Sequence, residues 1–344
     1  MTITDTWPGT LARLLHPPRR RQPTPLDHDW TRPAQELVDQ LLTTAGPGDE
    51  VAAAAERARV LSTLLRVDLT VLVAPELIDS LQAVVRPGGP ANPTAPGLST
   101  RQAARPPARP AATDVGATAL ISYALALLGR PTDPTALLDH ATDLTALGDQ
   151  QADLPAGADP AAPVTAEAYL LEALAACDAG RRYGDVMAAR RTVSARLCDQ
   201  QRPDGSWAGR PADSPYATTA CCALALQEAG LGARASAAVL RAVDWVLRTQ
   251  RTDGSWGRWS GTAEETGYAL QVLLATTDPP SARMAQAAAR GRAHLGTPDA
   301  RCPGTRTDVT GGGPGRSGRV VRAGILAAGH LARRVADGDA FGPA

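Results

Sequence analysis

The sequence contains no lysine: all 35 of its basic residues are arginine, and they are balanced by 35 acidic residues. Because the net charge is zero, no overall field would attract a nucleic acid, and we expect no such partner. No apolar run is long enough to span a bilayer, so no integral membrane segment is expected. The arginine run at 19–21 follows the first apolar residues, the reverse of a secretory signal. These absences favour a soluble, cytoplasmic protein.

Cysteine and aromatic residues are also scarce. The five cysteines have no metal-ligand spacing with one another or with histidine, so no metal site is expected from them. Four of the five lie in apolar segments that are typical of a helical core. Aromatic residues make up 3% of the chain, so aliphatic side chains must line most of any internal cavity.

No segment shows a sustained two-residue alternation of apolar and polar residues, and we therefore predict no strands. About twelve segments have the apolar spacing of helices instead. Helices expected to start near 114, 164, 216, 263 and 318 are rich in Ala, Leu and Thr, whereas those between them contain more Arg. This alternation predicts an inner and an outer ring of helices, in a double α-barrel or at least an αα-solenoid.

Proline marks two segments outside this helical pattern. Residues 1–30 contain a cluster of four prolines at 17–25 and a basic run, and we predict an N-terminal arm. Residues 86–112 contain seven prolines, which indicates either a functional loop at the mouth of a cavity or a disordered segment. The remainder of 31–340 is predicted to form one domain.

Two short segments share the pattern Q-x-x-x-G-x-W. The first runs from Gln201 to Trp207, the second from Gln250 to Trp256, and their tryptophans are 49 residues apart. Each follows one helical pattern and precedes another, so the repeating unit is a pair of helices. The Asp-Gly pair inside each copy predicts a turn, because glycine accepts a positive φ.

This repeat resembles the QW motif of class II terpene cyclases, the group of squalene–hopene and copalyl-diphosphate cyclases. The stretch 261–270 is similar to the inner helix that follows a QW motif in bacterial members. The resemblance covers about 110–340 well and 30–85 more weakly. It implies an all-α fold, an (α/α)6 double barrel of about twelve helices.

In that fold the QW residues have a structural role and connect outer helices to the next inner ones. The resemblance implies this role for Gln201, Trp207, Gln250 and Trp256. We expect each Gln amide to bond the backbone groups left unpaired at a helix end, with its plane stacked on the indole.

The resemblance also implies a reaction, in which a terminal alkene or epoxide is protonated and rings close through carbocations. Such a reaction needs a carboxylic acid and a dry cavity with aromatic faces, and it needs no redox cofactor. In the family, the acid is the central Asp of a D-x-D-D-T-A motif. The segment that starts at Asp114 matches this helix, but Gly116 and Ala117 replace the two later aspartates. Asp114 is therefore the candidate general acid, with a role as helix N-cap as the alternative.

Glu264 and Glu265 are the other candidate catalytic residues. Two carboxylates at the start of an apolar helix suit the helix dipole, which is the alternative explanation for them. In a catalytic role they would protonate the substrate, take the final proton or bind a metal.

Candidate substrate-binding residues are aromatics expected to face the barrel interior and arginines near helix starts. The aromatic candidates, for which core packing is the alternative, are Tyr123, Tyr169, Tyr216, Trp259 and Tyr268. The arginine candidates for a diphosphate or carboxylate head group are Arg210 and Arg322.

Together these features predict a class II cyclase acting on a linear C15–C20 prenyl diphosphate or a prenylated aromatic. No cofactor is required, although Mg²⁺ is a possible partner of the diphosphate. Two alternatives stay open: a barrel that ionises a prenyl diphosphate with Mg²⁺, and a non-catalytic barrel that binds an isoprenoid.

Overall fold

The structure is a computed structural model that describes residues 28–42, 50–86, 90, 112–151, 164–177, 180–209, 214–276, 279–295 and 317–336. Within these ranges it contains twelve α-helices and no strand, which confirms the predicted all-α class. The arm expected at 1–30 and the Pro-rich loop expected at 86–112 lie almost entirely outside the described residues.

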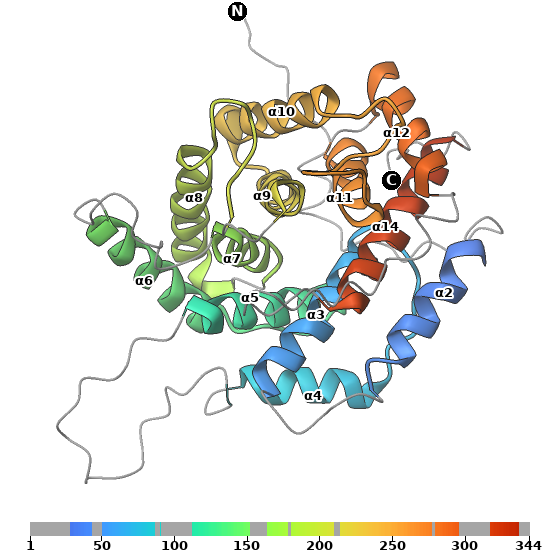
Figure 1. The fold of residues 1–344 in the computed structure, drawn as a ribbon. Coiled ribbons are helices and arrows are strands. Elements are labelled where there is room, and N and C mark those ends of the chain that lie inside the picture. The colour runs from blue at the N-terminus through green and yellow to red at the C-terminus, as the bar shows by residue number, and fades with distance from the viewer. Residues whose placement is uncertain are drawn as a thin grey trace, which may run out of the picture.

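Six helices form a closed inner ring in which each helix contacts the next (Figure 1). In ring order they are α3 (Glu50–Arg66), α5 (Ala112–Leu127), α7 (Val164–Ala176), α9 (Pro215–Ala229), α11 (Ala263–Ala275) and α14 (Gly318–Ala336), which returns to α3. The last five are the helices predicted for this ring from their low charge. The sequence did not assign α3, because its arginines resemble those of the outer helices.

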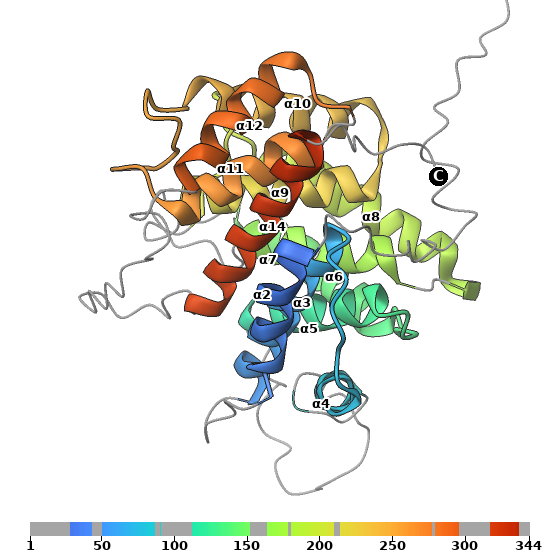
Figure 2. The same cartoon turned by 90° about the vertical axis from the view of Figure 1, so that its right-hand side faces the viewer.

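The other six helices pack around the outside of this ring, as Figure 2 shows from the side. They are α2 (His28–Asp39), α4 (Pro75–Val85), α6 (Thr135–Gln151), α8 (Tyr183–Asp199), α10 (Gly232–Arg248) and α12 (Ala282–Leu295). A 3₁₀ turn, η2 (Gly180–Arg182), precedes α8. Inner and outer rings together confirm the (α/α)6 double barrel.

The two rings differ in how they bury their residues. Helix α9 is surrounded by other helices, and 12 of its 15 residues are buried. Outer helix α10 buries one stripe at helical spacing, which includes Ala235, Ala238, Ala242 and Val246. A helix that is covered on all sides must be apolar on all sides, which explains the low charge of the inner ring.

The first QW motif joins three consecutive helices of the barrel. The indole N–H of the fully buried Trp207 donates to the carbonyl oxygen of Leu197 in α8 (2.7 Å), and its backbone N–H donates to Thr219 Oγ1 in α9 (3.1 Å). The side-chain amide of Gln201 donates to the carbonyl oxygen of Ala238 in α10 (2.8 Å). In the second copy, the same bonds link Trp256 to Val246 and Thr266, and Gln250 to Ala287 of α12.

One detail of the expected motif is wrong. We expected each Gln to bond the unpaired backbone groups at a helix end. One acceptor of each amide is the carbonyl oxygen of the glycine in its own motif, and the other, in Ala238 or Ala287, lies in the middle of the following outer helix. A helical carbonyl oxygen has a second lone pair, so it can accept this bond in addition to its helical one.

The glycine of each motif is explained by a close approach to the same outer helix. Gly205 has φ of 96°, and a Cβ placed on it would lie 2.3 Å from the carbonyl oxygen of Arg241. Gly254 has φ of 86°, and its Cβ would lie 2.8 Å from the carbonyl oxygen of Arg290. Only glycine fits such a contact, because both the backbone angle and the space exclude a side chain.

We expect Gly205→Ala to destabilise the protein by at least about 2 kcal/mol more than Gly129→Ala does. Gly129 is the matched control, because its φ is 71° but a Cβ there would meet nothing within 4 Å. The measurement is urea unfolding of both variants and the parent. Equal losses would mean that the contact with Arg241 contributes nothing beyond the backbone angle.

Candidate active site

The inner helices begin around one end of the barrel, which we call the mouth. Ser214, just before α9, donates to Glu265 in the first turn of α11 (2.6 Å). Ser317, just before α14, donates to Glu56 of α3 (2.7 Å). Neighbouring inner helices are therefore parallel, and residues in their first turns lie around a common opening.

Asp114 belongs to this end of the barrel. Helix α5 begins at Ala112, so Asp114 is inside the first turn and not in the N-cap position that precedes it. The side chain of Asp114 is outside the described part of the chain. A Cβ at Gly116 would lie 3.6 Å from that of Ala166 and 4.0 Å from the Tyr169 ring. The position of the family's acid therefore faces α7, and in this chain it holds none.

Glu265 is held by several hydrogen bonds at the mouth. Its backbone N–H donates to the hydroxyl of Thr262 (3.1 Å), which is one half of a capping box, and its carboxylate accepts from that same hydroxyl (3.2 Å). The carboxylate also accepts from the backbone N–H of Arg258 (3.2 Å) and from Ser214. Through these bonds Glu265 has a structural role, because it connects the segment after the second QW motif to α9 and α11. Glu264, half-buried in the same turn, stays a candidate acid or base.

Three of the predicted aromatics face the barrel interior, where arginines of α3 lie against two of them. The guanidinium of Arg66 is 5.2 Å from the centre of the Tyr123 ring, and that of Arg59 is 5.3 Å from the centre of the Tyr169 ring. Tyr268 of α11 is within electrostatic range of Arg59. Aromatic faces predicted to stabilise a carbocation therefore already hold a cation of the protein.

The inward placement predicted for the other two aromatics is wrong. Tyr216 packs against Trp245 of outer helix α10, with ring centres 4.7 Å apart, so it lies between the two rings of helices. Trp259 is 82% exposed on the segment before α11, and the Arg258 guanidinium covers its ring at 4.8 Å. In both cases the residue lies at the very start of a helix or before it, where the helical spacing no longer fixes its direction.

A buried ion pair lies inside the barrel below the mouth. Arg66, the last residue of α3, lies 2.5 Å from a carboxylate oxygen of Glu172 in α7, and it donates to the Tyr123 hydroxyl (3.3 Å). Glu172 and Tyr123 are almost completely buried. Burial raises the pKa of Glu172 from its ordinary 4.5 to about 7, although the Arg66 charge opposes the shift.

This shift predicts how stability depends on pH. Folded Glu172 holds its proton more tightly than the unfolded chain does, so its contribution is complete below pH 4.5 and is lost as the pH rises to about 7. Across that interval we expect the free energy of unfolding to fall by up to about 3 kcal/mol relative to Glu172→Gln. Urea unfolding of both proteins over this range measures the difference, and parallel curves would contradict the prediction.

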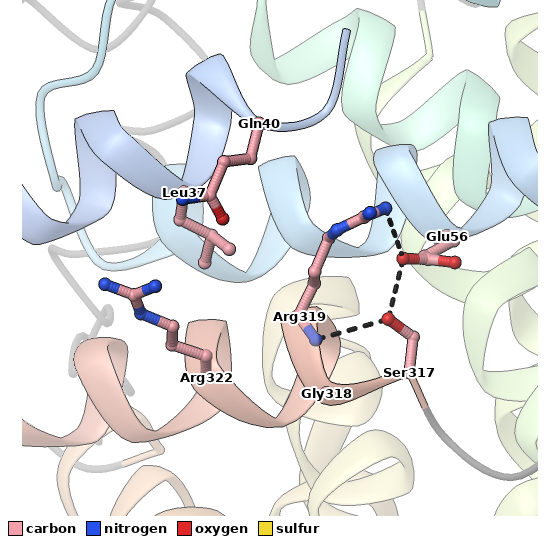
Figure 3. Close-up of a pocket in the computed structure, with 7 residues that line it drawn as sticks. All are labelled: Leu37, Gln40, Glu56, Ser317, Gly318, Arg319 and Arg322. Carbon is pink, nitrogen blue, oxygen red and sulfur yellow. Dashed lines mark hydrogen bonds and ion pairs between the residues drawn. The ribbon is translucent and has the colours of Figure 1, made fainter. Parts of the chain in front are cut away.

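Arg322 lies in an open pocket at the edge of the mouth, between α2, α3 and α14 (Figure 3). The pocket has a volume of about 610 Å³, and Arg319 beside it is paired with Glu56 (3.2 Å). The Arg322 side chain is 45% exposed, and its ion pair with Glu36 is long, at 3.9 Å. Its guanidinium is therefore open to an anion. Its role with a head group stays a prediction, and Arg210 lies outside the described residues.

Sequence reasoning missed the charged residues inside the barrel. In the sequence, Arg59 and Arg66 resemble surface residues of an outer helix. Glu172 lies within an apolar segment and was not predicted to have a role. A signal was present, because the two glutamates within a run as apolar as 164–176, Glu167 and Glu172, have no solvated face to occupy. Such a residue must be paired inside the protein, as Glu172 is.

Metal ligands and membrane-spanning helices can be assessed only for the described residues. No group of three or more His, Cys, Asp or Glu side chains in these residues is placed to hold a metal ion. Within the same ranges, no helix combines the length and the apolar character needed to cross a bilayer.

Comparisons with known proteins agree with this geometry. The family model for the squalene-hopene cyclase C-terminal domain matches residues 145–297, which include both QW motifs and α7 to α12. The solved structure of ent-copalyl diphosphate synthase from Streptomyces platensis superposes with a TM-score of 0.57 and 34% identity over 82% of this chain. The chain belongs to the class II terpene cyclase family.

Two further comparisons show how much of each related protein this chain spans. An ent-copalyl diphosphate synthase from a Streptomyces species is 50% identical over 109 residues, which are 31% of this chain and 20% of that protein. The chain also covers only 50% of the S. platensis structure. A type II terpene cyclase from Scytonema, 16% identical with a TM-score of 0.54, shares the fold over 90% of this chain and 99% of its own.

Proposed function

We propose that this chain is a protonation-initiated cyclase whose substrate is a linear prenyl diphosphate of the C15–C20 class. The observation that supports the proposal is the closed ring of inner helices, in which the helix that contains Asp114 begins at the mouth. It is supported by the similarity to ent-copalyl diphosphate synthases, one of which is 50% identical over 109 residues.

In the proposed reaction, the carboxylic acid of Asp114 donates a proton to the terminal alkene of the substrate. The resulting carbocation is attacked by the neighbouring alkenes, so that carbon–carbon bonds form in sequence. Loss of a proton from the last cation converts the cyclised hydrocarbon to a neutral alkene, and the diphosphate stays attached. The product therefore has the composition of the substrate, and no redox cofactor takes part.

Other residues are assigned to binding. We propose Arg322 as a contact for the anionic head group at the mouth, since its guanidinium is 45% exposed in the pocket there. Mg²⁺ is proposed only as a counter-ion of the diphosphate, and the cytoplasm is the proposed compartment.

Incubation of the purified protein with farnesyl and geranylgeranyl diphosphate, with EDTA or with Mg²⁺, tests the proposal. A cyclic product of unchanged mass that retains its diphosphate is the expected result. A product that has lost diphosphate, formed only with Mg²⁺, would indicate ionisation instead.

The replacement of the motif's later aspartates by Gly116 and Ala117 favours one other candidate, a barrel that binds an isoprenoid without converting it. Calorimetric titration distinguishes the two. Saturable binding of a prenyl diphosphate with no product under any condition would support the binding role and contradict the cyclase.

A further inference from the structure

Arg59 of α3 is a cation in the barrel interior that has no ion pair with the described carboxylates, and Glu172 acts on it only from a longer range. Its side chain reaches across to α7 and α9, where one guanidinium nitrogen lies 3.8 Å from Cys221 Sγ and the plane covers Tyr169. In the described part of the chain, no carboxylate lies within 4.0 Å of it. Arg66, two turns away, has Glu172 at 2.5 Å, so the two interior arginines differ in this respect.

The surroundings of Arg59 add neutral groups that can face an anion. The Tyr169 hydroxyl lies 3.6 Å from Cys221 Sγ, and Tyr268 approaches from α11. Tyr169, Cys221 and Tyr268 are the sixth, seventh and sixth residues of their helices, so this layer lies about 8 Å inside the mouth. Arg59 itself is half-buried.

A cation in a partly dry space is costly without a partner of opposite charge. It would also oppose the positive charge of a carbocation formed nearby. An anion bound to Arg59 removes both difficulties, because it neutralises the guanidinium and adds negative charge beside the reacting chain.

We propose that the barrel holds an anion-binding site centred on Arg59, with Cys221, Tyr169 and Tyr268 around it, for the carboxylate or phosphate end of an apolar ligand. This site is distinct from the head-group contact proposed for Arg322 at the mouth, because a ligand bound to Arg59 has its charged end inside the barrel. The inference goes beyond the proposed function and does not rest on turnover, since binding alone tests it.

The first test compares three ligands with the same hydrocarbon: geranylgeranyl diphosphate, geranylgeranoic acid and the neutral alcohol geranylgeraniol. Calorimetric titration of the full chain should give both anions at least about tenfold higher affinity than the alcohol. Arg59→Met should lower the affinity of both anions at least about fivefold and leave alcohol binding unchanged. Arg234→Met, which removes a surface arginine of α10, is the control and should keep the preference. Retention of the preference in Arg59→Met, or an equal loss for all three ligands, would overturn the site.

A second test uses the unmodified protein, in case Arg59→Met does not fold. Iodoacetate carries a carboxylate that Arg59 would hold while the Cys221 sulfur displaces iodide and its thiol proton passes to solvent. We expect iodoacetate to alkylate Cys221 at least about fivefold faster than neutral iodoacetamide, and geranylgeranoic acid to suppress the difference. Peptide mass spectrometry identifies the labelled cysteine. Faster labelling by iodoacetamide would contradict the site, and neither test depends on whether the barrel forms a cyclic product.

Discussion

Asp114→Asn is expected to reduce cyclisation by at least about 100-fold, the lower end of the contribution of a positioned general acid. The amide keeps the size of the carboxyl group but has no acidic proton for an alkene. Because Asp114 is in the first turn of α5 and not at its N-cap position, the helix should survive the change. The measurement is the rate of product formation from a prenyl diphosphate, followed by mass spectrometry, with circular dichroism to check the fold.

Glu264→Gln and Glu265→Gln are the controls that assign the loss to Asp114. Glu264→Gln should retain turnover within a factor of about 3, because in this account Glu264 is not the initiating acid. Glu265→Gln should mainly lower stability, because it alters a carboxylate that accepts bonds from Thr262, Arg258 and Ser214. Full activity in Asp114→Asn together with loss in Glu264→Gln would transfer the acid role to Glu264.

Trp256→Ala is expected to lower the free energy of unfolding by about 3 to 5 kcal/mol. The indole is completely buried, and it bonds the end of α10 while its backbone N–H bonds Thr266 of α11. The ring packs directly on the backbone of Gly291, where a Cβ would lie 2.6 Å from it. Removal of the ring leaves a cavity there, because glycine has no side chain to fill the space. Chemical unfolding of the variant measures the effect.

Trp259→Ala is the matched control, three residues along the same segment. Trp259 is 82% exposed, so its loss should change the free energy of unfolding by no more than about 0.5 kcal/mol. If the two variants were equally stable, the view that the QW tryptophan holds consecutive helix pairs together would be untenable.

Most of the architecture was accessible from the sequence, because it depends on periodic patterns. Inner helices such as α9 and α11 are covered on every side, and this forces a composition low in charge that stands out. The QW turns were accessible for a similar reason: the positive φ of Gly205 and the burial of Trp207 allow few other residues.

The interior of the barrel was less accessible, because periodicity gives the face of a helix but not the partner that a side chain meets. Arg59 and Arg66 made α3 resemble an outer helix, yet both point inward, where Arg66 is neutralised by Glu172. Tyr216 has the spacing of an inward residue, but its position at the first turn of α9 allows it to meet Trp245 of α10. Such pairings depend on how the rings are assembled and not on local sequence.

The most direct test of protonation-initiated cyclisation is to run the reaction in D₂O and measure the product by mass spectrometry. The acidic proton of Asp114 exchanges with solvent, so protonation of the terminal alkene should place one deuterium in a cyclic product that still carries its diphosphate. A cyclic product without deuterium, or one that has lost diphosphate, would contradict the account.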